Sequence, residues 1–271
     1  GVSWVHGTEI GIAASKDGAN WRYVGTANIN IGGDEYSYWA PDVLEHDGTY
    51  HMFLTYVPGI FEHWGYPRSI HHLTSTNLID WEDHGPIALA SDRCIDATVL
   101  RLDDGTWRMW YNNEVDAKSI YYADSPDLFT WTDKGKAVGE RQGEGPVVFR
   151  WKGRNWMIVD VWSGLGVYHS DDFINWVRQP ENLVEQPGRG LDDQVIGRHA
   201  GVAIDANDRA YLFYFTHPGH HLAPNNADGY FNRRSSIQVV EMKLEDGKLV
   251  ADRDAPTYIN LGTPRQGART R

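Results

Sequence analysis

The sequence predicts an all-β fold: a five-bladed β-propeller whose first blade is incomplete in this chain. One observation behind this prediction is a turn in which a tryptophan follows a serine by six positions. A second is a repeated pair of strands, and a third is that no segment has a helical period with caps. The four copies of the turn are SKDGANW (15–21), STNLIDW (75–81), SPDLFTW (125–131) and SDDFINW (170–176).

Two short strands joined by a turn precede each of the last three copies. In these strands β-branched and aromatic residues alternate around DG or KG, which are hairpin signals. The units are WAPDVLEHDGTYHMFLTYV (39–57), IDATVLRLDDGTWRMWYN (95–112) and EGPVVFRWKGRNWMIVDV (144–161). A fourth, HAGVAIDANDRAYLFYF (199–215), leads into SSIQVVEMKLEDGKLVADR (235–253). A β-sandwich with similar hairpins is the alternative, which four turns of one internal spacing disfavour.

The repeat length is about 45 to 60 residues, the size of a propeller blade. We therefore expect a single propeller domain over residues 1–271. Its blades are predicted at 9–25 (partial), 39–88, 96–140, 144–187 and 199–255. The two inner strands missing from the first blade would precede residue 1, come from the C-terminal segment or come from another chain.

Composition limits the partners. The formal net charge of −12 argues against nucleic acid or an anionic membrane, since both need a basic footprint. Aromatic residues make up 13% of the chain, which suits a sheet-rich core or a surface that stacks on sugar rings. The lone cysteine, Cys94, excludes an internal disulfide. No membrane span or signal-peptide pattern is present; an extracellular or periplasmic location is favoured, and a homodimer is allowed.

Candidate catalytic residues follow from aligning the blades on their hairpin turns. Stepping back nine positions from Gly48, Gly105, Gly153 and Asp208 gives Trp39, Asp96, Glu144 and His199. The innermost strands of a propeller surround its axis, so these side chains are expected to face one funnel. Each also has a structural interpretation: a turn cap for Asp96, a tight turn for Glu144, and core packing for His199 and Trp39. Carboxylates at such a position cost stability unless they are used.

Paired carboxylates across a sugar-sized pocket are the equipment of glycoside hydrolysis. Asp96 and Glu144 are therefore the predicted catalytic pair, and aromatic rings around them would stack on a sugar face. Glu9 and Asp42 are further acids, and Asp42 lies three residues along the strand from the aligned position, Trp39. The predicted substrate-binding residues are Trp39, Asp42, Tyr56, Trp110, Trp162, His199 and His217.

At these residues the chain resembles known enzymes. YWAPDV, CIDATV followed by DDGTWRMWY, and EGPVVF followed by KGRNWMIV are similar to the blade-opening motifs of five-bladed-propeller glycoside hydrolases of families 43 and 117. HGTEIGIAAS, YFTHP and RRSSIQVVEMKLEDGKLVADRD favour the second family. The resemblance covers nearly the whole chain, and its motifs are more specific for the fold than for the substrate.

The resemblance implies an inverting mechanism with three acids. Asp96 matches the aspartate that orients the acid and tunes its pKa, and Glu144 matches the general acid. His199 matches a histidine near the propeller axis that in some members lies beside a hydrated metal ion; a Ca or Zn ion is therefore allowed, though none is required. The base belongs on the first inner strand of blade one, which this sequence lacks. In some family 117 members a neighbouring histidine is proposed as the acid instead.

The predicted function is hydrolysis of plant or algal oligosaccharides by an inverting acid/base mechanism. A carbohydrate-binding propeller that has lost its general base is the alternative. A transferase or phosphorylase is a third possibility. A phosphorylase needs a basic cluster in the funnel, but none of the four aligned residues is Arg or Lys, and Arg198 is only adjacent to one of them, His199. A metal-dependent hydrolase is disfavoured, because HH (71–72) and HPGHH (217–221) lack a metal-binding spacing with a carboxylate.

Overall fold

The computed structural model describes residues 7–61, 63–219 and 234–262. Every regular element within these ranges is a β-strand, as predicted. None of these segments forms a helix long and apolar enough to cross a bilayer. The chain divides into two compact units. The first comprises Gly1–Ile12, Gly25–Val148 and Asp172–Trp176, and the second comprises Ala13–Val24, Phe149–Asp171 and Val177–Arg271.

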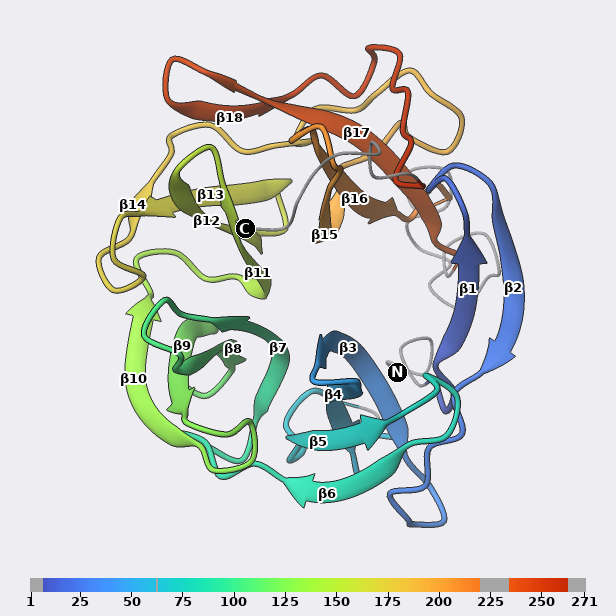
Figure 1. Ribbon diagram of the computed structural model, residues 1–271, viewed down its shortest axis with the longest axis vertical. Helices are drawn as coiled ribbons and strands as arrows, with labels where there is room; N and C mark the ends of the chain where they lie inside the picture. The colour runs from blue at the N-terminus through green and yellow to red at the C-terminus, as the bar shows by residue number, and fades with distance from the viewer. Residues whose placement is uncertain (1–6, 62, 220–233, 263–271) are drawn as a thin grey trace. The chain divides into compact units, whose positions relative to one another are not determined.

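The first unit contains two four-stranded antiparallel sheets, each a meander in which consecutive strands pair (Figure 1). One sheet consists of β3 (Ser37–His46), β4 (Thr49–Val57), β5 (Ser69–Ser75) and β6 (Glu82–Pro86). The other consists of β7 (Cys94–Arg101), β8 (Trp107–Asn113), β9 (Ser119–Ser125) and β10 (Thr132–Val138). The first sheet packs against β7, the edge strand of the second.

Two further meanders and a short sheet complete the described elements. One meander is β11 (Glu144–Trp151), β12 (Arg154–Asp160), β13 (Leu165–Ser170) and β14 (Val177–Arg178), with β11 beginning in the first unit. The other is β15 (Arg198–Ile204), β16 (Ala210–Thr216), β17 (Ser236–Glu245) and β18 (Lys248–Ala251). β1 (Gly11–Ser15) and β2 (Trp21–Thr26) form a two-stranded sheet. The described ranges thus contain four sheets of four strands, and the sheet nearest the N-terminus, β1–β2, has only two. This agrees with the prediction that the first blade is incomplete.

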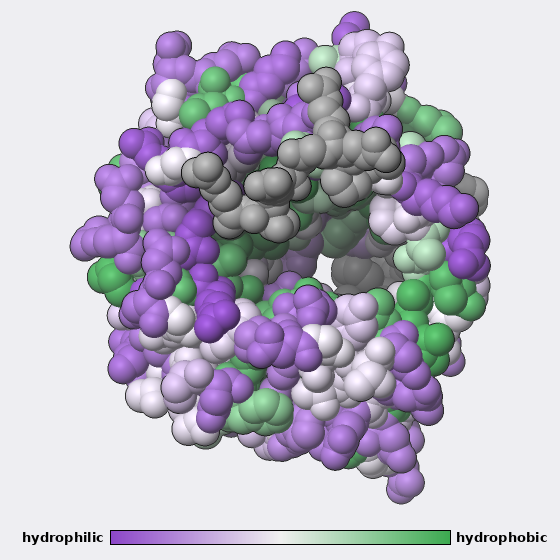
Figure 2. Space-filling model, in the orientation of Figure 1, coloured by the Kyte–Doolittle hydropathy of each residue, from purple (hydrophilic) through white to green (hydrophobic). Residues whose placement is uncertain are grey.

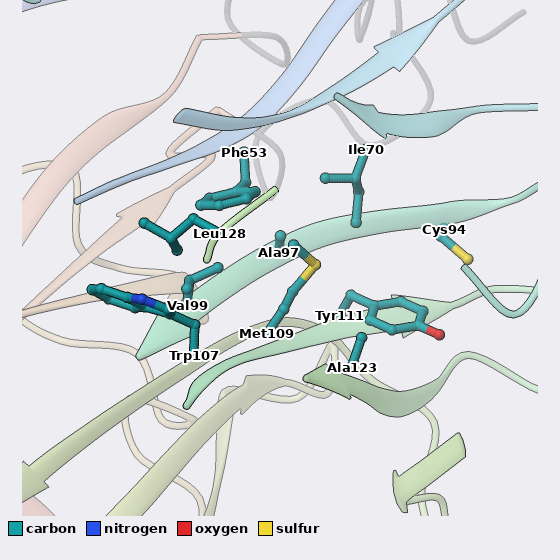
Figure 3. Close-up of a cluster of buried hydrophobic side chains, with 10 residues drawn as sticks. All are labelled: Phe53, Ile70, Cys94, Ala97, Val99, Trp107, Met109, Tyr111, Ala123 and Leu128. Carbon is teal, nitrogen blue, oxygen red and sulfur yellow. The ribbon is translucent and has the colours of Figure 1, made fainter. Parts of the chain in front are cut away.

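The core of the first unit lies between its two sheets (Figure 3). Phe53 and Ile70 come from the β3–β6 sheet and pack with Val99, Met109 and Tyr111 of the other. Full burial of one large apolar side chain stabilises the fold by about 1.5–3 kcal/mol. This packing holds β7, which carries Asp96, against the neighbouring sheet.

The visible face of the molecule is mostly hydrophilic (Figure 2). This agrees with a mean hydropathy of −0.52 and a net charge of −12. Hydrophobic residues appear there as separate green patches among the hydrophilic ones (Figure 2).

The recurring turn is built by its own side chains. In SPDLFTW, the Ser125 hydroxyl accepts the Asp127 amide (3.2 Å), and the Asp127 carboxylate accepts the amides of Phe129 (2.9 Å) and Thr130 (2.7 Å). The Trp131 indole N–H donates to the carbonyl of Leu128 (2.8 Å). Serine, Asp or Asn, and tryptophan recur at fixed spacing because each satisfies a particular backbone group of the turn.

The fourth residue of every copy has a left-handed backbone. These residues are Gly18 (φ 82°), Leu78 (φ 66°), Leu128 (φ 69°) and Phe173 (φ 60°). The tryptophans differ in burial, since Trp21 is 54% exposed and Trp81 only 9%. In the fourth copy the Phe173 carbonyl accepts Arg108 Nη1 (3.3 Å), and the Trp176 indole N–H has no hydrogen-bond partner among the described residues. The four turns therefore share one backbone conformation, while the burial of their tryptophans differs.

A group of histidines lies beside Phe129 in the first unit. His51 Nδ1 and His72 Nε2 are 2.9 Å apart, and both side chains are buried. The Phe129 ring centroid lies 4.6 Å from that of His72 and 5.2 Å from that of His84. Burial lowers the pKa of His51, and burial together with the charges of His51 and His84 lowers the pKa of His72 to about 3. The site therefore favours neutral imidazoles.

The adjacent His71 has a different environment. Its Nδ1 lies 3.0 Å from Asp83 Oδ1, and its ring centroid lies 5.1 Å from that of Tyr56. Consecutive residues of a strand point to opposite faces, which separates His71 from His72. His71 and His72 therefore lie on opposite faces of β5 and do not form one ligand site.

Replacing a turn tryptophan should cost stability in proportion to its burial. We expect Trp81→Ala to lower the free energy of unfolding by about 3–5 kcal/mol, because it leaves a cavity where the indole packed. The matched variant Trp21→Ala should cost about 1 kcal/mol, since a half-exposed ring loses less buried area. Denaturant unfolding of both variants measures the difference. Equal losses would contradict the expectation that the cost depends on burial of the tryptophan.

The buried histidines should make stability fall in acid. His72 takes up a proton near pH 3 in the folded chain but near 6.5 when unfolded. Between these values the unfolded state binds more protons, so lowering the pH from about 6.5 should reduce the free energy of unfolding by up to about 1.4 kcal/mol per pH unit from this one group. His72→Phe should flatten that slope while leaving the slope between pH 7 and 8 unchanged. An unaltered acid slope would show that His72 is not responsible.

Candidate active site

A backbone irregularity marks the start of the first strand in three of the four-stranded sheets. The pairing register skips between Trp39 and Asp42 in β3, between Ile95 and Thr98 in β7, and between Arg198 and Gly201 in β15. A left-handed residue lies in each bulge, and β11 has one at the equivalent place. These residues are Ala40 (φ 36°), Asp96 (φ 58°), Gly145 (φ 58°) and His199 (φ 28°). A bulge of this kind redirects the side chains beside it.

This alignment corrects the register derived from the turns. Asp96 and His199 occupy the left-handed position, whereas Trp39 and Glu144 come one residue before it. The reason lies in the hairpin loops. β3 and β4 are joined through two residues, but β7 and β8 are joined through five, 102–106, so the turn glycine falls one position later. The same five-residue loop, 205–209, follows β15.

Asp96 is buried, with 4% of its surface exposed, and it bridges strands. Its backbone N–H donates to the Thr55 hydroxyl (3.1 Å). Its Oδ2 accepts the backbone N–H of Gly145 (3.0 Å), the residue that follows Glu144. The structure therefore places the Asp96 carboxylate against the peptide that carries Glu144. A glycine suits this place because its φ of 58° is disfavoured for residues with a Cβ.

Glu144 begins β11 and is partly buried. Its Oε2 lies 3.2 Å from the Lys118 ammonium, and the same ammonium lies 2.7 Å from Glu114 Oε1. Lys118 belongs to the connection between β8 and β9. Glu144 is thus held on one oxygen by a lysine that it shares with a second carboxylate.

Glu114 is in turn paired with Arg68. Both side chains are almost fully buried, and the guanidinium contacts the Glu114 carboxylate directly. Arg68 Nη2 also donates to the Trp64 carbonyl (2.8 Å). Burying such a pair is tolerated when both charges are compensated and hydrogen-bonded.

Trp39 lies beside this charged group. The Arg68 guanidinium carbon is 5.2 Å from the Trp39 ring centroid, and the Trp64 ring centroid is 6.1 Å from it. Trp64 is 49% exposed and comes from the connection between β4 and β5. Register pairing of Ser37 with Val57 places that connection at the same strand ends as Trp39. An exposed indole there could stack on a sugar.

Tyr56 is directed into a different group of aromatic rings. Its hydroxyl donates to the Gly32 carbonyl (3.0 Å), and its ring centroid lies 6.5 Å from Tyr36 and 6.3 Å from Tyr38. The side chain borders the core that includes Tyr38. Its part in binding a sugar stays a prediction.

Trp110 corrects the sequence-based list of sugar-stacking rings. Its exposed fraction is 0%, and its ring centroid lies 5.7 Å from Phe173 and 6.2 Å from Trp176. A ring with no exposed face belongs to the core. The middle of β8 is covered on both faces, which the sequence pattern alone did not reveal.

Asp42 joins two strands. Its Oδ2 accepts the backbone N–H of Val99 in β7 (2.9 Å). Desolvation outweighs the amide hydrogen bonds from Val99 and Val43 and raises the pKa of Asp42 to about 6. The position supports packing of β3 on β7, which gives Asp42 a structural use independent of substrate.

In the second unit, His199 and Trp162 are organised by Asp160. One Asp160 oxygen accepts the backbone N–H of Trp162 (2.8 Å), and the other accepts that of His199 (3.2 Å). Asp160 is buried; desolvation raises its pKa above the ordinary value although the positive charge of His199 opposes the shift. The carboxylate therefore fixes the backbone at two of the predicted substrate-binding residues.

His217 lies beside Phe215, with ring centroids 5.1 Å apart, and Phe215 lies 5.9 Å from His199. His217 Nδ1 is 3.3 Å from the Arg234 carbonyl oxygen. The other histidines of HPGHH, His220 and His221, lie outside the described residues.

Four residues with a direct place in these arrangements were missed from the sequence: Arg68, Glu114, Lys118 and Asp160. The first three lie in or next to the connections after β4 and β8, which have no counterpart of equal length in the other repeats. Asp160 is the last residue of β12, before a turn, and could have been recognised from the sequence as an acid at a strand end.

The family model described as "Glycosyl hydrolases family 43" matches residues 2–161, more than half of the chain. The chain belongs to glycosyl hydrolase family 43. The resemblance to that family inferred from the blade motifs is confirmed. No curated protein matches the chain.

Solved structures show the propeller fold of this family 43 chain. A thermostable family-43 glycoside hydrolase has a TM-score of 0.70 at 17% identity, over 96% of this chain and 88% of that one. A xylan β-1,4-xylosidase from Bacillus halodurans C-125 has a TM-score of 0.65 at 19% identity, over 89% of this chain and 49% of that one. An endo-arabinase from Bacteroides thetaiotaomicron VPI-5482 has a TM-score of 0.63 at 22% identity, over 89% and 88%.

Proposed function

We propose that this family 43 protein is an inverting glycoside hydrolase of plant or algal oligosaccharides, with Glu144 as general acid and Asp96 as the residue that orients it. The observation that carries the proposal is the hydrogen bond between the Asp96 carboxylate and the Gly145 amide (3.0 Å). It joins two acids from different sheets at one place. Glycoside hydrolysis is carried out by carboxyl groups, and the proposal assigns one of these roles, proton donation, to Glu144.

In this mechanism Glu144 gives its proton to the glycosidic oxygen as the bond from that oxygen to the anomeric carbon breaks. The negative charge of Asp96 favours the protonated form of Glu144 before the step, whereas the Lys118 ammonium, 3.2 Å from Glu144 Oε2, favours the carboxylate. A water then attacks the anomeric carbon from the opposite face, and a base takes up its proton. A divalent cation held through water at His199 remains part of the proposal, but none of these steps uses it.

The sugar class is supported by the similar structures, which include a xylosidase and an endo-arabinase. Exposed Trp64 and the neighbouring Trp39 offer indole faces for pentose or hexose rings. Arg68 and Lys118 both bind the Glu114 carboxylate. This arrangement favours a hydrolase over a phosphorylase, because cations compensated in this way attract phosphate less strongly.

A carbohydrate-binding protein without catalysis is the second candidate. The observation in its favour is the β1–β2 sheet, which holds two strands where the other sheets hold four. Among the described residues no acid stands on a first inner strand of that sheet, where the resemblance expects the base.

Removal of the proton donor should discriminate between leaving groups. We expect Glu144→Gln to lower kcat/KM on unactivated oligosaccharides by about 10²–10⁴-fold, because their leaving oxygen needs protonation. Activated aryl glycosides need little assistance and should lose much less. Steady-state kinetics on both substrates measure the effect. Equal losses would point to another acid, with His217 the next residue to substitute.

None of the described residues occupies the strand position expected for the base, and this leads to a second prediction. Inversion needs a carboxylate about 6.5–9.5 Å from the acid, with a water between them. We expect the 271-residue chain alone to hydrolyse xylan-, arabinan- and agar-derived oligosaccharides slowly while still binding them. Azide attacks without losing a proton and should accelerate turnover. Rapid turnover by a monomer without azide would place the base within residues 1–271 and contradict the prediction.

A further inference from the structure

The connection between β8 and β9 carries a lysine that contacts the proposed proton donor. Lys118 Nζ is 3.2 Å from Glu144 Oε2 and 2.7 Å from Glu114 Oε1. Ala117 and Lys118 both have left-handed backbones, with φ of 50° and 52°. Residues with a Cβ rarely adopt this conformation, and such strain gathers where the surrounding structure or function requires it.

The lysine is anchored from behind. Glu114 is almost fully buried and is itself paired with the buried Arg68, so the carboxylate that holds Lys118 has little freedom. Burial disfavours the charged ammonium, but the charges of Glu144 and Glu114 outweigh it and raise the pKa of Lys118. Lys118 is therefore a fixed cation and does not act as a proton donor near neutral pH.

The charges of this group depend on the state of Glu144. Arg68 and Lys118 contribute two positive charges, and Glu114 contributes one negative charge. The four side chains together are neutral only when Glu144 is ionised, which is its state after it has given up a proton. A charge-assisted hydrogen bond to a carboxylate is stronger than one to its neutral form.

We propose that Lys118 is a positioning residue for Glu144: it binds Oε2 and stabilises the carboxylate formed by proton transfer. The inference rests on the proposed function and extends it to a residue outside the pair of acids. In the step itself the proton leaves the Glu144 carboxyl group for the glycosidic oxygen, the bond from that oxygen to the anomeric carbon breaks with its electrons on the oxygen, and Lys118 keeps its proton throughout.

The test compares Lys118→Met and Lys118→Arg with Lys136→Met in the full chain, with azide present so that a weak base does not limit turnover. Lys136 Nζ binds Asp116 (2.6 Å) in the same connection and controls for general loosening of it. On unactivated oligosaccharides, Lys118→Met should lower kcat by about 10- to 100-fold with little change in KM, the value of a charge-assisted hydrogen bond. On aryl glycosides the loss should be a few-fold at most.

Lys118→Arg should restore most of the lost rate, because it keeps the charge, whereas Lys136→Met should resemble the parent. The proposal is overturned if Lys118→Met loses equally on both substrate classes, if arginine restores nothing, or if Lys136→Met loses as much. A parent chain that turns over neither substrate class, with or without azide, would instead overturn the hydrolase function itself, and the inference with it.

Discussion

The Asp96 carboxylate and the Gly145 amide form the hydrogen bond on which the candidate site depends, because it connects the start of β7 to the start of β11. It needs two unusual backbones at once, a left-handed aspartate and a left-handed glycine. An aspartate tolerates this region better than most residues, and glycine has no Cβ to clash. The bulge in β7 that contains Asp96 interrupts regular pairing and redirects the side chains at that strand end. The unusual backbone conformations therefore lie at the residues of the candidate site.

Around this hydrogen bond, charge is arranged so that each buried ion has a compensating neighbour. Arg68 faces Glu114, Glu114 faces Lys118, and Lys118 faces Glu144. A buried ion without a partner would be costly, and a chain of alternating charges lowers that cost. In the second unit Asp160 is used differently: it binds the backbone amides of Trp162 and His199 and shapes the chain there.

The repeats differ most where they leave the regular strands. The connection after β4 supplies Trp64 and Arg68, and the connection after β8 supplies Glu114 and Lys118. Loops are free to vary because the meander beneath them is stabilised by its own hydrogen bonds and apolar packing. A scaffold of similar sheets can therefore carry one asymmetric group of side chains, supplied by loops that share no repeat with one another.

The sequence by itself determined the all-β class, the repeated sheets and the incomplete first one, because alternation, turn residues and a fixed serine-to-tryptophan spacing are local properties of the chain. It also predicted that Asp96 and Glu144 lie at one site, and the structure places the Asp96 carboxylate on the amide of the residue after Glu144. Tertiary structure decided that Trp110 is fully buried, since burial depends on which strands cover it. It also showed that Trp39 and Glu144 lie one residue before the left-handed position. The hairpin loops differ in length, so the number of residues between the bulge and the turn differs from sheet to sheet. The Lys118–Glu144 contact was inaccessible to pattern reasoning, since it joins residues 26 positions apart through a loop with no repeat.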